Sequence, residues 1–157
     1  MAEQGDPVMA ALHVAAEDDA VTTKSTVALP VAAFSKRLDD LVARLKQQVA
    51  QDGEDLGDAT HAVQYLHESL FGPGGFRVAP GSMDAFRPYR IYMHKVLTQR
   101  IGTQPALGAL FASFVLRARQ AGIVGDFDVQ IRLSGGAQVP DARVAEADGD
   151  AEWCACC

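Results

Sequence analysis

Three cysteines lie within the last four residues, at Cys154, Cys156 and Cys157, and the chain has no others. Thiols this close together can bind a soft metal ion or form a redox pair. The last four residues also fit, loosely, the signal for prenylation of Cys154, although no polybasic segment precedes them. The remaining interpretation, which we favour, is that this cluster has no function. A disulfide scaffold and a two-part cysteine zinc site are excluded.

The histidines do not form a metal-binding pattern. His13 and Glu17 are four residues apart and would share one helical face, but a lone pair with no third ligand is typical of a solvated face. His61 and His67 are six residues apart and would not share a face. We predict that His94 packs beside the core with its polar atoms satisfied. We therefore expect no metal and no cofactor.

The charge balance narrows the class of partner. The net charge is −6, whereas nucleic-acid-binding domains usually carry a basic stripe. No run of basic residues is longer than two, so we expect no nucleic acid as a partner. No apolar run approaches the length of about 20 residues that crosses a bilayer. The first residues resemble neither a secretory signal nor a transit peptide. A protein partner is expected, and the location stays open between cytoplasm and plastid.

Apolar periodicity and capping residues predict the elements that must position these side chains. Asp6 and Pro7 mark a helix start, and residues 21–28 are expected to be a linker. The turn Gly72–Gly75 follows a helix and lacks a Lys-Ser/Thr pair, so it predicts a structural turn rather than a phosphate cradle. The expected helices are 7–18, 30–52, 59–71, 89–101 and 105–120, and the expected strand is 127–133.

The segment GTQPALGALFASFVLRARQAG, residues 102–122, predicts the central helix. Thr103 is the expected N-cap, Pro105 lies in the first turn, and Gly122 is the expected stop. Large apolar residues cover one face and small residues cover the other, which allows neighbouring backbones to approach closely. The helix is therefore expected to be buried at the centre of a mainly helical α+β domain.

Four segments, in this order, resemble the SirB-type, transglutaminase-like domain family. They are ALHVAAEDD (11–19), LPVAAFSKRLDDLVARLK (29–46), YLHESLFGPGGF (65–76) and MHKVLTQRIGTQPALGALF (93–111). The resemblance covers residues 7–133, and AGIVGDFDVQI (121–131) is most similar to plant and algal members. It implies a papain-like or transglutaminase-like core, with a central buried helix and at least one strand, in a form shortened at the C-terminal side.

The resemblance also implies where catalysis would occur. Active relatives of the larger fold carry a Cys near the N-terminus of the central helix, a His on a later strand, and an Asp that orients the His. The Cys position falls on Gln104, with Thr103 and Pro105 as its neighbours, and none of these carries a thiol. No His follows Leu133. The family's triad therefore cannot be assembled from this chain.

We expect three segments: a flexible N-terminus (1–6), the transglutaminase-like domain (7–133) and a disordered acidic tail (134–157). The expected function is that of a non-catalytic interaction or regulatory module. The alternative is a fragment of a thiol- or hydroxyl-dependent hydrolase or acyl transferase, whose catalytic His and Asp lie beyond this chain. The first interpretation leans on the missing nucleophile, and the second requires residues that the sequence does not contain.

Overall fold

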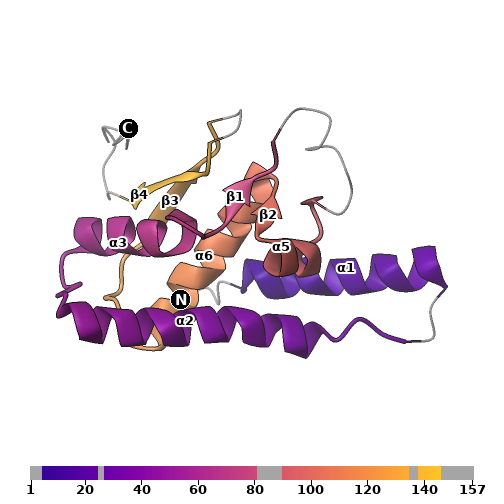
Figure 1. The fold of residues 1–157 in the computed structure, drawn as a ribbon, viewed down its shortest axis with the longest axis horizontal. Helices are drawn as coiled ribbons and strands as arrows, with labels where there is room; N and C mark the ends of the chain where they lie inside the picture. The colour runs from indigo at the N-terminus through magenta and orange to yellow at the C-terminus, as the bar shows by residue number, and fades with distance from the viewer. Residues whose placement is uncertain (1–4, 25–26, 81–89, 135–137, 146–157) are drawn as a thin grey trace.

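A computed structural model of the chain describes residues 5–24, 27–80, 90–134 and 138–145. Five helices and two small sheets follow one another in these residues, which confirms the predicted mainly helical α+β class (Figure 1). In chain order they are α1 (Pro7–Thr23), α2 (Val31–Asp52), α3 (Ala59–Phe71), β1 (Arg77–Val78), α5 (Met93–Gln99), β2 (Ile101–Gly102), α6 (Gln104–Gln120), β3 (Val129–Arg132) and β4 (Asp141–Val144).

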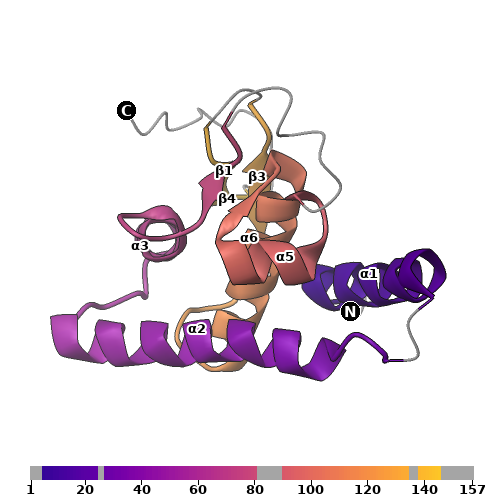
Figure 2. The same cartoon turned by 45° about the vertical axis from the view of Figure 1, so that its right-hand side comes forward.

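Helix α6 is the centre of the fold, as predicted. It packs against α1, α2, α3, α5, β1 and β3. Figures 1 and 2 show it rising behind α2, with α1 on one side and α3 on the other. Leu107, Leu110 and Phe111 are fully buried. The backbone at Gly108 approaches β3 closely, because an added Cβ there would be in contact with side-chain carbons of both Ile131 and Leu133 at 3.4 Å.

The two sheets are short and differ in direction. β1 pairs with β2 in parallel, and Arg77 lies opposite Ile101. β3 pairs with β4 antiparallel, from Val129 opposite Val144 to Arg132 opposite Asp141. β3 packs on α6 and β4 packs on α3. The sheet β3–β4 therefore covers α3 and the central helix from one side.

Helix boundaries agree with the capping signals where a side-chain cap exists. The Asp6 carboxylate accepts from the backbone N–H groups of Val8 and Met9 at the start of α1. Asp58 accepts from the N–H of His61 at the start of α3. Gly53 and Gly122 both have positive φ, at 68° and 67°, where chains leave their helices. These positions favour glycine because a Cβ is disfavoured there.

Three expectations about elements are wrong. α1 continues to Thr23, so the first part of the expected linker is helical. α5 covers only 93–99, because Arg100 takes a left-handed conformation and ends it. Residues 141–144 form β4 although the segment was expected to be disordered, because β3 supplies a pairing partner and α3 a packing surface.

Candidate functional site

The N-terminus of α6 is built as its sequence predicted. The Thr103 hydroxyl accepts a hydrogen bond from the Ala106 N–H at 3.4 Å, so Thr103 is the N-cap. The Thr103 N–H donates to the carbonyl of Arg90 at 3.1 Å, which ties the helix start to the chain before α5. Pro105 is exposed in the first turn. The helix dipole would favour a negative charge at this end.

Gln104, the first residue of α6, is 8% exposed. Its amide nitrogen Nε2 donates to the carbonyl of Gln138 at 2.6 Å, just before β4. A primary amide is neutral and holds no nucleophilic lone pair of the thiolate kind. This side chain therefore joins the start of the central helix to the segment that leads into the β3–β4 sheet.

His67 reaches the same segment from α3. Its Nε2 lies 2.9 Å from the carbonyl oxygen of Pro140, which requires the proton on Nε2. The ring also packs edge-on against Phe111 and at a tilt against Phe71, with centroids 5.8 and 4.9 Å away. The predicted site residue Gln104 and a histidine from another helix are thus both committed to holding residues 138–140.

The α6 N-terminus therefore contains little of the chemistry that acyl transfer requires. Covalent catalysis needs a nucleophile, a base within hydrogen-bond reach, and a group that orients the base. In the described part of the chain, the only hydrogen bond made by the Thr103 hydroxyl is the capping bond. The described strand β4 carries no histidine. Among the residues that the structure describes, no base is hydrogen-bonded to this hydroxyl, so nothing there activates it.

The other predicted candidates lie apart from this place. His13 and Glu17 are exposed on α1, and His61 contacts Glu54 and the Asp55 carbonyl at 3.5 and 3.3 Å. Within the ranges described, no group of three or more His, Cys, Asp or Glu side chains could hold a metal ion. The candidates Cys154, Cys156 and Cys157 lie outside the described residues.

His94 is buried, as predicted, but not satisfied. Its ring lies between Tyr92, stacked at 5.8 Å, and Phe34, edge-on at 5.6 Å, and only 8% of the residue is exposed. Nδ1 has no hydrogen-bond partner among the described residues. Burial lowers the pKa of His94 below its usual value, the positive charge of Lys95 lowers it further, and Asp19 partly opposes this. The expectation of satisfied polar atoms is therefore wrong for Nδ1.

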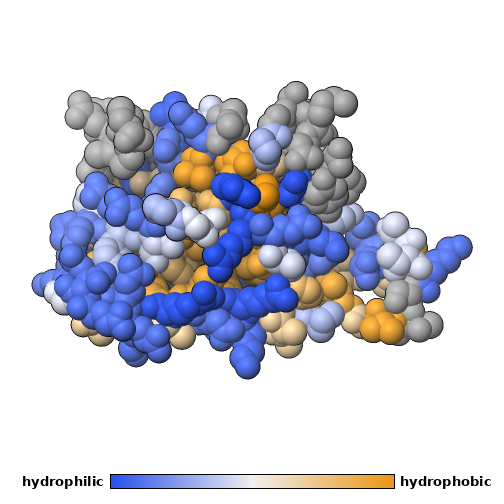
Figure 3. All heavy atoms as spheres, viewed as in Figure 1, coloured by the Kyte–Doolittle hydropathy of each residue, from blue (hydrophilic) through white to orange (hydrophobic). Residues whose placement is uncertain are grey.

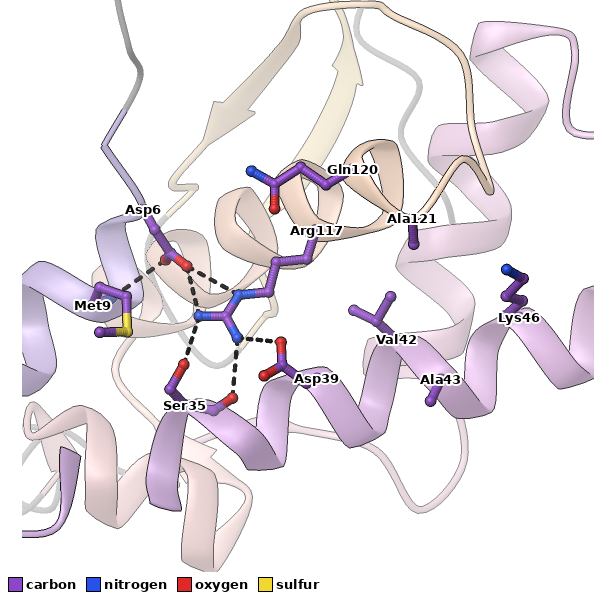
Figure 4. Close-up of a pocket in the computed structure, with 10 residues that line it drawn as sticks. All are labelled: Asp6, Met9, Ser35, Asp39, Val42, Ala43, Lys46, Arg117, Gln120 and Ala121. Carbon is purple, nitrogen blue, oxygen red and sulfur yellow. Dashed lines mark hydrogen bonds and ion pairs between the residues drawn. The ribbon is translucent and has the colours of Figure 1, made fainter. Parts of the chain in front are cut away.

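Sequence reasoning missed a charged cluster around Arg117, in the last turn of α6 (Figure 4). The guanidinium binds Asp6 through both Nε and Nη2, at 2.9 and 2.6 Å. It donates to the carbonyl and hydroxyl of Ser35, each at 3.0 Å, and to Asp39 at 2.6 Å. Ser113, fully buried on α6, donates to the other oxygen of Asp6 at 2.6 Å. The cluster thereby fastens α1 and α2 to the central helix.

This cluster lines an open hollow of about 650 Å³, together with Met9, Val42, Lys46 and Gln120. A guanidinium has five N–H donors, and the five bonds of Arg117 use them all. Burial raises the pKa of the Asp6 carboxyl, but the bonds from Ser113 and Arg117 and the Arg117 charge outweigh it, so that pKa lies below its usual value. The hollow is therefore a structural joint with no free donor from Arg117 for a ligand.

Comparison with protein families gives one match. The model for the transglutaminase-like superfamily matches residues 32–123, which is more than half of the chain and runs from α2 to the end of α6. Comparisons with curated proteins and with solved structures gave no significant match. In the described residues, no helix is both long and apolar enough to cross a membrane.

Proposed function

The chain belongs to the transglutaminase-like superfamily, and on that premise we propose that it is a non-catalytic member that acts as an interaction or regulatory module. The observation that carries the proposal is the state of Gln104. This residue stands where the resemblance puts the nucleophile, and its amide is buried and bonded to Gln138. The finer assignment, a SirB-type domain similar to plant and algal members, rests on the four sequence segments and is part of the proposal.

Several catalytic groups are missing from the α6 N-terminus, and not the thiol alone. A thiolate at a helix N-terminus is stabilised by the dipole and by a nearby protonated base. Here the α6 N-terminus presents an amide, a capping hydroxyl and a proline. His67, which reaches the neighbouring segment, uses Nε2 to hold the Pro140 carbonyl. The central helix is present, but Gln104 and His67 use their side chains to bind the segment 138–140.

The test is an assay of hydrolysis and acyl transfer with ester, amide and glutamine-peptide substrates. We expect no turnover above background for the full chain. A companion variant carries Gln104→Cys in a background of Cys154→Ser, Cys156→Ser and Cys157→Ser, so that the new thiol is the only one. We expect this thiol to react with iodoacetamide without supporting turnover, because no base accompanies it.

Turnover by the unmodified chain that disappears in Thr103→Ala would overturn the proposal and identify the hydroxyl as the nucleophile. Pro105→Ala is the matched control, because it changes a neighbouring exposed residue without removing the cap. Turnover that appears only with Gln104→Cys would instead show that this chain supplies a base, and that only the nucleophile is missing.

A further inference from the structure

A groove with three arginines lies between α2, α5 and the turn Gly72–Gly75. It consists of two adjoining hollows of about 200 and 240 Å³. The hollows share Arg44, Arg100, Leu41 and Phe76, and one of them adds Arg37 and Leu97. We call it the basic groove. Figure 3 shows this face of the molecule, where strongly hydrophilic side chains surround hydrophobic surface near its centre.

The arginines of the basic groove keep most of their donors available. Arg37 donates once, to the Thr98 hydroxyl at 3.0 Å, and lies over the Phe34 ring. Arg44 donates once, to the carbonyl of Asp40 at 3.2 Å. Arg100 donates once, to the carbonyl of Gly74 at 2.8 Å. Since each guanidinium has five donors, four remain on each within the described structure.

The floor and walls of the groove are fixed by the fold. Phe76 is 3% exposed and Leu97 is 7% exposed, so the side chains beneath the groove belong to the packed core. The Gly72–Gly75 turn closes on itself, with the N–H groups of Gly72, Gly75 and Phe76 bonded to backbone carbonyls at 2.7 to 2.9 Å. An added Cβ at Gly72 or Gly75 would lie 2.3 Å from a carbonyl oxygen, so both positions require glycine.

The groove is positive although the chain is negative. Its charged lining residues are Arg37, Arg44, Arg100 and Asp40, which sum to +2, while the whole chain has a net charge of −6. A cluster of positive side chains does not increase the solubility of a chain whose net charge is negative. A local positive surface with unused forked donors favours a ligand that carries carboxylates, which guanidinium groups bind in bidentate geometry.

We propose that the basic groove binds an extended acidic peptide segment of a partner protein. The inference rests on the proposed function as an interaction module, and names the class of partner. Arg37 and Arg44 are seven residues apart on α2, which places them about 10.5 Å apart along the helix axis. This spacing suits two anionic groups placed along the groove. In a polyproline-type peptide, residues i and i+3 lie on one face about 9 Å apart, so two acidic side chains match the two arginines.

Nucleic acid fits the groove less well than a peptide. Backbone phosphates need a continuous basic track, and the net charge of −6 would repel them outside the two hollows. A short acidic peptide needs only the local positive charge of the three arginines. The other occupant with suitable chemistry is the chain's own segment 146–152, which contains four carboxylates and no basic residue.

The test measures binding of a fluorescein-labelled peptide, with Glu at every third position in a Pro-Ala background, to the full chain by fluorescence anisotropy at low salt. We expect saturable binding that weakens with salt, and at least tenfold weaker binding of the peptide with Gln in place of Glu. Arg37→Gln and Arg44→Gln are each expected to weaken binding about fivefold, in the range for partly exposed charge pairs. The matched control is Lys46→Gln, which removes one positive charge from α2 at the other hollow.

Four outcomes would overturn the proposal. Equal binding of the Glu and Gln peptides would show that the carboxylates are not recognised, and an effect of Lys46→Gln as large as that of Arg44→Gln would show unspecific attraction. Equal or tighter binding of a single-stranded oligonucleotide would exclude a peptide as the preferred partner. If replacing Glu146, Asp148, Asp150 and Glu152 by their amides raises peptide affinity tenfold, the groove belongs to the chain's own segment. None of these outcomes depends on the turnover assay, so the two proposals fail separately.

Discussion

Arg117 and the arginines of the basic groove differ in how many of their guanidinium N–H donors are hydrogen-bonded within the described structure. Arg117 is 10% exposed in its side chain, and its five N–H donors bind Asp6, Ser35 and Asp39. Arg37 and Arg44 are exposed, and each donates one hydrogen bond within the described structure. Arg117 therefore joins α1, α2 and α6, whereas Arg37 and Arg44 present N–H donors to solvent.

The difference suggests how to distinguish an arginine that stabilises the fold from an arginine that is available to bind a ligand. A large hollow lined by Arg117 attracts attention as a site, yet its guanidinium is saturated. The basic groove is smaller, but its donors are unused. An anion that binds beside Arg117 would have to replace hydrogen bonds that already exist, whereas one that binds in the basic groove would not.

The largest effect is expected at the saturated arginine. Arg117→Ala should lower the free energy of unfolding by about 3 kcal/mol, because it leaves the partly buried Asp6 carboxylate without its positive partner. Urea denaturation followed by far-ultraviolet circular dichroism measures this. Arg117→Lys should recover only part of the loss, since an ammonium cannot bind three residues with a fork.

The control for this change is Lys46→Ala, which alters another cation lining the same hollow. It should change the free energy of unfolding by less than about 0.5 kcal/mol. Full recovery of stability by Arg117→Lys would contradict the donor count, because charge alone would then be sufficient.

The second effect separates the charge of Asp6 from its capping role. Asp6→Asn keeps a side-chain oxygen for the N–H groups of Val8 and Met9 but removes the charge facing Arg117. We expect a loss of about 1–2 kcal/mol at pH 7, which is typical of a charge-assisted pair. Urea denaturation of both proteins across the pH range measures the difference.

The pH dependence follows from the pKa of Asp6, which the fold holds below its usual value of 3.8. A group with a lowered folded pKa stabilises the fold above the unfolded pKa and loses this effect as pH falls through the folded pKa. The difference between the unmodified chain and Asp6→Asn should therefore be constant above about pH 5 and shrink below pH 4. A difference that stays constant down to pH 2 would show that the charge is not responsible.

His94 is a third case, buried like Arg117 but with Nδ1 unpartnered in the described structure. Because burial lowers its pKa below 6.5, the unfolded chain takes up the proton first as pH falls. Stability should therefore be complete above about pH 7 and decline below pH 6.5. The groups that face it, Asp19 on α1 and Lys95 on α5, act in opposite directions.

The measurement is urea denaturation between pH 5 and 7.5 for the unmodified chain and for His94→Gln. The variant should lose the part of the pH dependence that lies in this range, by a smaller amount than the Asp6 effect. His13→Gln on the exposed surface of α1 is the control and should leave the dependence unchanged. An unchanged profile in His94→Gln would mean that another group titrates.

Local signals predicted much of this fold because their causes are local. Asp6 and Thr103 cap their helices through bonds to residues two or three positions later, and the sequence shows both partners. The buried face of α6 follows from its composition for the same reason. β4 was missed because it also packs on α3, which ends at Phe71 and is far away in sequence, and because β3 pairs with it only across an intervening segment.

The Arg117 cluster and the basic groove were harder to predict, because each combines residues that are distant in sequence. The pairing of Arg117 with Asp6 was not predicted, because nothing local indicates a partner 111 residues away in sequence. The basic groove combines α2 with Arg100, whose side chain crosses to Gly74 only in the folded chain. The spacing of Arg37 and Arg44 on one face of α2 was the only signal available in the sequence.

The smallest effect on stability is expected where the largest effect on binding is proposed. Arg37→Gln and Arg44→Gln each remove one donor bond from an exposed helix face, so the free energy of unfolding should change by less than about 0.5 kcal/mol. The double variant should be nearly additive, because neither arginine has an ion-pair partner within the described residues.

The measurement is the same urea titration that is used for Arg117→Ala, so both regions of the molecule are compared on one scale. If Arg44→Gln cost as much as Arg117→Ala, its donors would be structural, and the loss of peptide binding in that variant would no longer identify the groove. A small cost together with a fivefold loss of affinity would separate the two roles. Stability then depends on the arginine whose donors are all used, and recognition depends on the arginines whose donors are not.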